Sequence, residues 1–159
     1  MIVKKLKILS QNVCKNSLIV NTLLETQNQF DIILIQEPPW SKIHKILSSS
    51  DCKEEPLMET NHYPNWILFA RILLEKSDMP RVIAYINTRL SSLLFLLCKD
   101  IINHRDIGLI SFLNNNIYYY IMNVYLDLSH SALKYLKDIE VNINNVLLMI
   151  GDFNIRDSL

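Results

Sequence analysis

Apolar runs and amphipathic segments alternate along the first part of the chain. Residues 6–12 alternate weakly between apolar and polar side chains and predict a strand. Residues 17–27 then place apolar side chains at helical spacing, with Ser17 as a candidate N-cap. The continuous apolar run over 32–35 is typical of a strand that is covered on both faces. Strand, helix and strand in this order predict a βαβ-like start.

The remainder of the chain predicts mainly strands. Strand patterns cover residues 66–73, 81–87, 93–97, 107–113, 117–125 and 146–150, with a hairpin-like connection between the first two. One further helix is expected after Ser129 or Ser131, with Leu133, Leu136 and Ile139 as its apolar stripe. Strands in series with few helices favour a pair of mixed sheets in a single domain over residues 1–159.

Composition narrows the class of protein. Sixteen acidic and sixteen basic side chains cancel, so binding of a polyanion would depend on a local cleft. No apolar run reaches the roughly 18 residues of a membrane span, and we expect no membrane association. Cys14, Cys52 and Cys98 are odd in number and far apart. They predict buried thiols without a disulfide partner in an intracellular protein, with nucleus and cytoplasm not distinguished.

Glycine is rare, with only two residues in the chain. One of them, Gly151, stands directly before Asp152 at the end of the last predicted strand. A position kept small at this point indicates close approach of backbone or of a ligand.

Polar side chains follow several of the predicted strands. Asn12 ends the first, Glu37 follows the second, Tyr125 ends a later one, and Asp152 and Asn154 follow the last. Mg²⁺ prefers oxygen ligands and is often held by one or two carboxylates together with substrate phosphate. If the strands are neighbours, these side chains would converge on a metal and phosphate site. Strand ends that simply meet solvent, and a turn at Asp-x-Asn, are the alternative interpretations.

In combination these residues resemble a known family. The segments are Gln-Asn at 11–12, Phe-Asp-Ile-Ile-Leu-Ile-Gln-Glu-Pro-Pro at 30–39, Asn-x-Tyr at 123–125, and Gly-Asp-Phe-Asn-Ile-Arg-Asp-Ser-Leu at 151–159. They resemble the endonuclease/exonuclease/phosphatase superfamily, in particular the endonuclease domain at the N-terminus of LINE-type retrotransposon polyproteins, especially fungal ones. The resemblance covers nearly the whole chain and is weakest over residues 41–61.

The resemblance implies a fold, an activity and a set of roles. The fold would be a four-layer α/β sandwich, and the activity would be hydrolysis of phosphate esters with Mg²⁺ or Mn²⁺. Glu37 and Asn12 would be metal ligands, Asp152 would orient the attacking water, and Asn154 would contact the scissile phosphate. Tyr125 would lie near that phosphate, and Arg156 would help to hold DNA.

The chain also departs from the pattern of the superfamily. Tyr125 is followed by Leu-Asp-Leu, where many members have a proline and an asparagine. The closing Ser-Asp-His motif is absent, and none of the four histidines stands in a matching context. The resemblance therefore predicts a sandwich that is incomplete at the C-terminus, has little or no activity alone and associates through its incomplete sheets.

Three functions stay open at this point, and with them the question of whether the chain is an active enzyme. The first is a DNA endonuclease domain of a retroelement, whose intact relatives would nick DNA and supply a 3′-hydroxyl for reverse transcription. The second is a catalytically dead relic that binds DNA or a protein. The third is a phosphoesterase that acts on small molecules or lipids.

Overall fold

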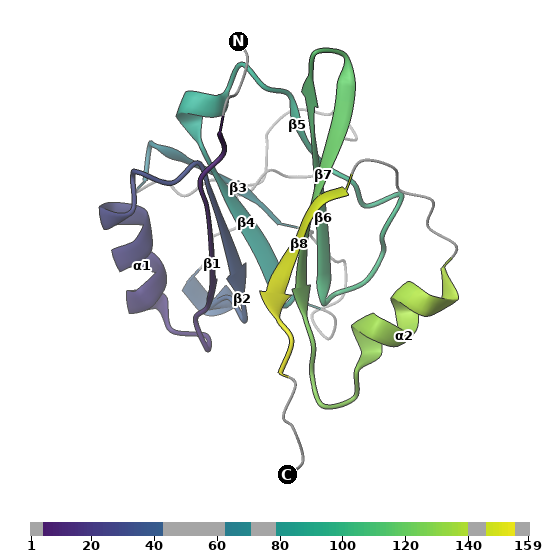
Figure 1. Ribbon diagram of the computed structural model, residues 1–159. Helices are drawn as coiled ribbons and strands as arrows, with labels where there is room; N and C mark the ends of the chain where they lie inside the picture. Colours follow the sequence, from purple (N-terminus) through teal and green to yellow (C-terminus); the bar gives the residue numbers. More distant parts are fainter. Residues whose placement is uncertain (1–4, 43–62, 71–78, 140–145, 155–159) are drawn as a thin grey trace, which may run out of the picture.

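The computed structural model describes residues 5–42, 63–70, 79–139 and 146–154. Two four-stranded sheets pack against each other, and one helix covers the outer face of each sheet (Figure 1). The layers therefore run helix, sheet, sheet, helix. This arrangement confirms the predicted four-layer α/β sandwich built from a pair of mixed sheets.

The first sheet contains the βαβ start. Its order is β1 (Ile8–Asn12), β2 (Ile32–Gln36), β4 (Val82–Asn87) and β3 (Trp66–Phe69). β1 and β2 pair in parallel, whereas β4 is antiparallel to both of its neighbours. All five residues of β2 are buried. The continuous apolar run therefore has the predicted cause, because a helix covers one face of β2 and the other sheet covers the opposite face.

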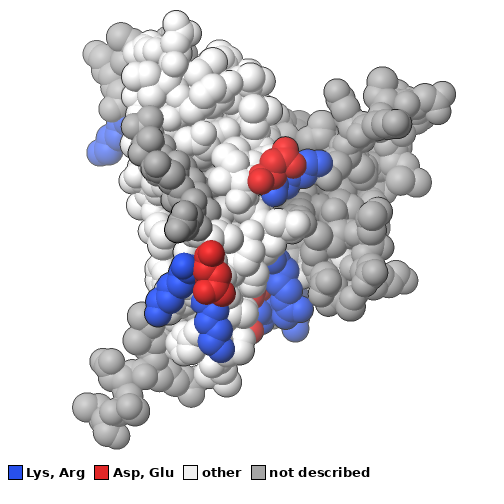
Figure 2. Space-filling model, turned by 90° about the vertical axis from the view of Figure 1, so that its right-hand side faces the viewer, with Lys and Arg blue, Asp and Glu red and all other residues white. Residues whose placement is uncertain are grey.

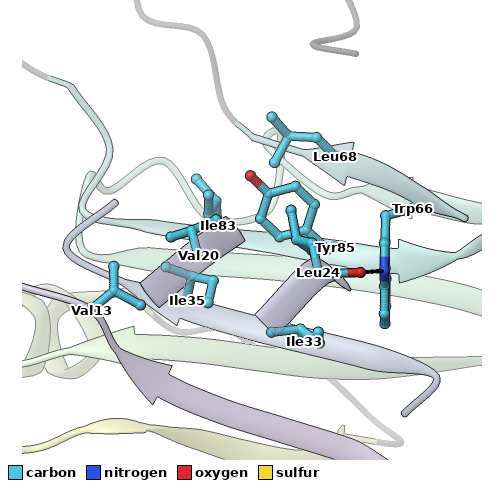
Figure 3. Close-up of a cluster of buried hydrophobic side chains, with 9 residues drawn as sticks. All are labelled: Val13, Val20, Leu24, Ile33, Ile35, Trp66, Leu68, Ile83 and Tyr85. Carbon is cyan, nitrogen blue, oxygen red and sulfur yellow. Dashed lines mark hydrogen bonds between the residues drawn. The ribbon is translucent and has the colours of Figure 1, made fainter. Parts of the chain in front are cut away.

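Helix α1 (Ser17–Thr26) covers the first sheet. Its N-cap is Asn16, whose side-chain oxygen accepts hydrogen bonds from the first turn, so the predicted cap at Ser17 was wrong by one residue. Val20 and Leu24 are the buried residues of the helix and point toward the sheet (Figure 3). The indole Nε1 of Trp66 donates to the carbonyl of Leu24 at 3.0 Å, which ties the helix to β3.

The second sheet has the order β5 (Phe95–Leu97), β6 (Ile107–Asn114), β7 (Ile117–Tyr125) and β8 (Val146–Asp152). β6 and β7 form a hairpin whose two turn residues, Asn115 and Asn116, both have positive φ. β7 and β8 are parallel. A Cβ on Gly151 would lie 1.7 Å from the carbonyl oxygen of Val124, so the predicted close approach is one of backbone to backbone.

Helix α2 (Ser131–Asp138) covers the second sheet through the fully buried Ala132. Neither of the predicted residues caps this helix. The hydroxyl of Ser129 bonds Asp127, and the hydroxyl of Ser131 bonds Asp106. The N-cap position is His130, which has a φ of 52° and no capping side-chain bond. Leu133 was predicted to be buried but is 41% exposed. In the described part of the chain, no helix is long and apolar enough to cross a membrane.

Two short 3₁₀ turns, Trp40–Lys42 and Thr88–Leu90, complete the described elements. The thiols also differ from the prediction, because Cys14 is exposed and Cys98 is only partly buried. Cys14 has positive φ and stands in the turn directly after β1, outside both apolar layers. Both thiols are free, and Cys52 lies outside the described residues.

Candidate functional site

The ends of four strands meet at one end of the sandwich. β1 and β2 are parallel in the first sheet, β7 and β8 are parallel in the second, and β8 also lies against β1 and β2. In Figure 1 the arrowheads of β2 and β8 lie close together. Because the strands of each pair run in the same direction, the polar residues that end them are brought to the same edge.

Asn12 connects the two sheets at this edge. Its side-chain Nδ2 donates to Oδ2 of Asp152 at 2.7 Å, and its Oδ1 accepts from the backbone N–H of Cys14 at 2.8 Å. The carboxamide is thereby fixed with its nitrogen toward the carboxylate. Asn12 was predicted to accompany Glu37 as a metal ligand, but the carboxylate that it bonds is that of Asp152, and its own oxygen holds the turn after β1.

Asp152 is half-buried and held from a second side as well. Its Oδ1 accepts the backbone N–H of Asn154 at 3.0 Å. Asn154 has a φ of 41°, and its Nδ2 donates to the carbonyl of Leu126 at 2.8 Å. Gly151 and Asp152 therefore end β8, and the side chain of Asp152 closes a turn with Asn154, as the alternative interpretation of Asp-x-Asn held. This turn fixes the direction of the Asp152 carboxylate.

Glu37 approaches from the first sheet. Its φ of 50° is unusual for a residue other than glycine and turns the chain sharply at the end of β2. The backbone holds this turn, because the N–H of Glu37 donates to Arg81 and its carbonyl accepts from Lys15, both at 2.8 Å. The half-buried carboxylate accepts the hydroxyl of Tyr125 at 3.1 Å, across the sandwich.

Tyr125 lies between the two carboxylates. It pairs with Asp152 in the β7–β8 ladder and donates to Glu37. Burial raises the pKa of Tyr125 above its ordinary value, and the hydrogen bond and charge of Glu37 raise it further. The charge of Asp152 acts in the same direction, while Arg81 opposes it. The phenol is consequently protonated at neutral pH and acts as a hydrogen-bond donor.

A buried amide pair locks the sheets together one layer below these residues. Gln36 Nε2 donates to Asn123 Oδ1 at 2.6 Å, and Asn123 Nδ2 donates to the carbonyls of Ile35 and Ile83. Gln36 is 1% exposed and Asn123 is 3% exposed. Gln36 directly precedes Glu37, and Asn123 lies two residues before Tyr125. The amide pair therefore sets how Glu37 and Tyr125 face each other.

Sequence reasoning missed an ion-pair cluster beside Tyr125. Arg81 bonds the carboxylate of Asp106, which is buried. It also bonds the carboxylate of Asp127 at 2.7 Å. Its guanidinium lies 4.8 Å from the centre of the Tyr125 ring. Hydrogen bonds from Arg81 and Ser129 hold the pKa of Asp127 well below its usual range. The available signals were an arginine just before a buried strand and an aspartate just after Tyr125.

The set of donors fits a hard cation. Glu37 and Asp152 supply carboxylate oxygens, and neither sulfur nor imidazole takes part in the contacts given above. Within the described ranges, no group of three or more His, Cys, Asp or Glu side chains is gathered as a metal site. Water and substrate phosphate would have to complete the coordination of a cation bound here. Arg156, the predicted DNA-binding residue, lies outside the described residues.

The surface charge is mixed on the face that Figure 2 shows, which is the side of α2 in Figure 1. Acidic and basic side chains lie next to one another there, and most of the described surface is uncharged. On this face the described residues form no basic stripe of the kind that follows a nucleic-acid backbone.

Comparisons with known proteins bear on the fold. No family model matches the chain, and no curated protein matches it. Among solved structures, "Endonuclease domain of TRAS1, a telomere-specific non-LTR retrotransposon" aligns at a TM-score of 0.66 and 14% identity, over 96% of this chain and 62% of that one. "Humanized D. rerio TDP2" aligns at a TM-score of 0.53 and 14% identity, over 96% and 63%.

A third structure is an endonuclease/exonuclease/phosphatase family protein from Leptotrichia buccalis, with a TM-score of 0.43, 16% identity and coverage of 94% and 67%. The chain thus spans less than two thirds of the length of the first two structures. At such identities it is the fold that is shared. The chain therefore shares the fold of a retrotransposon endonuclease domain and of TDP2, which is the fold that the resemblance of its motifs predicted.

Proposed function

We propose that this chain is a divalent-metal-dependent phosphodiester hydrolase-like domain of the retroelement endonuclease type, with DNA as its substrate. The observation that carries the proposal is the pairing across the sheets at the site. Glu37 of the first sheet bonds Tyr125 of the second, and Asp152 of the second bonds Asn12 of the first. Two carboxylates from distant parts of the chain are thus held at one edge by uncharged partners.

Glu37 and Asp152 would hold Mg²⁺ or Mn²⁺, and Asn12 and Tyr125 would orient them. The metal would neutralise charge on the phosphate. Each carboxylate already accepts a hydrogen bond that fixes its direction, which is the support that metal ligands commonly receive from their neighbours. Asn12 would act mainly through Asp152, because its own oxygen accepts a backbone N–H.

Asp152 would also orient the attacking water, and Asn154 would contact the scissile phosphate. The Nδ2 group of Asn154 has two N–H donors, and one of them bonds the carbonyl of Leu126. The second N–H is the donor that we assign to a phosphate oxygen. Arg156 would contribute to DNA binding two residues further on.

We expect the activity of this chain alone to be low. Among the described residues only two carboxylates gather at the site, and three or more ligands of the types that hold metals are not found together. Few charged ligands give a weak site, so the chain should need millimolar metal. Any nicking of DNA would serve the role proposed for its relatives, the supply of a 3′-hydroxyl for reverse transcription.

Titration with Mn²⁺, followed by its electron paramagnetic resonance signal, tests the metal site directly. Wild-type protein should bind one ion, while Glu37→Gln and Asp152→Asn should each weaken binding roughly 10- to 100-fold. Asp138→Asn, on the exposed end of α2, is the control and should bind normally. Equal binding by all four proteins would overturn the proposal.

A parallel assay with supercoiled plasmid and Mg²⁺ tests the substrate. Slow nicking that is lost in Glu37→Gln supports a nuclease, and turnover of inositol phosphates instead would support a small-molecule phosphoesterase.

A catalytically dead DNA- or protein-binding module is the second candidate. It is favoured by the internal hydrogen bonds that already occupy both oxygens of Asp152. Salt-dependent DNA binding without any Glu37-dependent Mn²⁺ binding would support it.

A further inference from the structure

Arg81 and Asp106 join the two sheets next to the candidate site. Arg81 directly precedes β4 in the first sheet, and Asp106 directly precedes β6 in the second. The guanidinium bonds both carboxylate oxygens of Asp106, through Nε to Oδ1 and through Nη2 to Oδ2. Asp106 is fully buried. A bidentate Arg–carboxylate pair at a buried position requires one specific geometry, so it fixes the relative position of the strands that directly follow the two residues.

The backbones of the same two residues hold the two sides of the site. The carbonyl of Arg81 accepts the N–H of Glu37 at 2.8 Å, and the carbonyl of Asp106 accepts the N–H of Tyr125 at 2.9 Å. The ion pair therefore connects the anchor of Glu37 to the anchor of Tyr125. The guanidinium also faces the ring of Tyr125, with 4.8 Å to its centre. Tyr125 is thus held by its backbone from Asp106 and by its ring from Arg81.

We propose that the Arg81–Asp106 ion pair is a clamp that sets the Glu37–Tyr125 hydrogen bond, with Arg81 as the positioning residue for the phenol. Asp127 supports the clamp from outside by accepting a second bond from Nη2 at 2.7 Å. The effect of the clamp on metal binding rests on the proposed function, whereas its effect on Tyr125 does not. Lysine could not replace Arg81, because a single ammonium cannot bond both oxygens of Asp106 in parallel and also stay over the Tyr125 ring.

Removal of Arg81 alone would take its bidentate partner from the buried carboxylate of Asp106 and leave it with the Ser131 hydroxyl and with Arg105 at 3.6 Å. The protein could then fail to fold. The test therefore uses the paired variant Arg81→Met/Asp106→Asn. The matched control is Arg89→Met/Asp31→Asn, which removes the Arg–Asp pair at the other end of β2, where Arg89 Nε bonds Asp31 Oδ1 at 2.8 Å. Circular dichroism checks that both variants are folded.

The first readout is the NMR signal of the Tyr125 ζ-carbon at neutral pH, assigned with Tyr125→Phe. In the wild-type background, Glu37→Gln should shift this signal, because the partner of the phenol changes. In the paired clamp variant the same substitution should no longer shift it, whereas in the control pair the response should be kept. A loss of packing unrelated to the clamp would not abolish the response to one specific partner.

The second readout is the Mn²⁺ dissociation constant, which should rise about 10-fold in the clamp variant and stay unchanged in the control. A clamp variant that keeps both the ζ-carbon response and native Mn²⁺ affinity would overturn the clamp. Wild-type protein without Glu37-dependent Mn²⁺ binding would instead overturn the proposed function, and the ζ-carbon response would then decide the clamp alone. If the clamp variant unfolds while the control folds, Arg81→Lys is measured in its place. Native response in this lysine variant would contradict the clamp.

Discussion

Asn12 at the end of β1 donates a hydrogen bond to Asp152 at the end of β8, 2.7 Å away. The two residues are 140 positions apart in the chain and belong to different sheets. This contact joins the edge strands of the two sheets at the candidate site. It explains how residues of the first and the last strand come to lie in one candidate site.

The substitution Asn12→Ala tests whether this bond orients Asp152 for metal binding. Loss of the donor frees the carboxylate to rotate, and we expect the Mn²⁺ dissociation constant to rise about 10-fold. Gln11→Ala, the exposed neighbour in the same strand, is the control and should leave the affinity unchanged. Unchanged affinity in Asn12→Ala would show that Asn154 alone suffices to hold Asp152.

Gly151→Ala should destabilise the fold next to the site. The added Cβ would lie 1.7 Å from the backbone oxygen of Val124, and neither strand of a parallel pair can yield without losing ladder bonds. We expect a loss of about 3 kcal/mol in the free energy of unfolding, measured with urea. Gly108→Ala is the matched control in the same sheet, because its Cβ would meet only side-chain atoms, those of Val82 at 3.3 Å and Asn123 at 3.9 Å. A loss in Gly108→Ala as large as that in Gly151→Ala would contradict this explanation.

Asn123→Ala should test the buried amide pair. It removes two donors to backbone carbonyls and takes from the buried Gln36 the stronger of its two acceptors, leaving the Ser10 hydroxyl at 3.1 Å. The expected loss in unfolding free energy is about 2–3 kcal/mol. A double-mutant cycle with Gln36→Ala should be non-additive, since both residues belong to one contact. Additive losses would mean that the two amides act independently.

Stability should decrease in acid through Asp127. The hydrogen bonds that lower its pKa below the ordinary value of 3.8 favour the charged form in the folded protein. This contribution is present above about pH 4 and is lost as the pH falls through the folded-state pKa. Urea unfolding at pH 7 and pH 3 should show a smaller acid loss in Asp127→Asn than in wild type. An identical acid loss would assign the effect to other carboxylates.

Self-association is expected through the outer edge of β8. In the described part of the chain β8 is an edge strand, with Leu147 54% exposed and Met149 47% exposed, and it carries no charge before Asp152. Sedimentation velocity should show concentration-dependent association that Leu147→Lys/Met149→Lys reduces. Leu128→Lys, in an exposed loop, is the control and should not alter it. A monomer at all concentrations would refute this prediction.

Much of the fold could be predicted because strands carry strong local signals. Residues 117–125 were predicted as a strand with the bounds that β7 has, and the apolar run of β2 correctly indicated a strand covered on both faces. Besides the burial of Leu133 and of the thiols, the errors occur at helix starts. The hydroxyl of Ser129 bonds Asp127, two residues away, in a local turn that competes with capping. The hydroxyl of Ser131 bonds Asp106, 25 residues away, and this contact exists only in the folded protein.

The sequence indicated residues that the structure gathers at one edge, Asn12, Glu37, Tyr125 and Asp152, but it did not indicate the contacts among them. The sequence by itself determined which strands end in polar groups, because the pattern of apolar and polar residues is local. Only the tertiary structure decided that Asn12 holds Asp152, that Tyr125 bonds Glu37, and that Arg81 joins Asp106 beside them. The physical reason is that parallel pairing within each sheet and packing between the sheets set which strand ends meet. Neither of these relationships leaves a periodic signal along the chain.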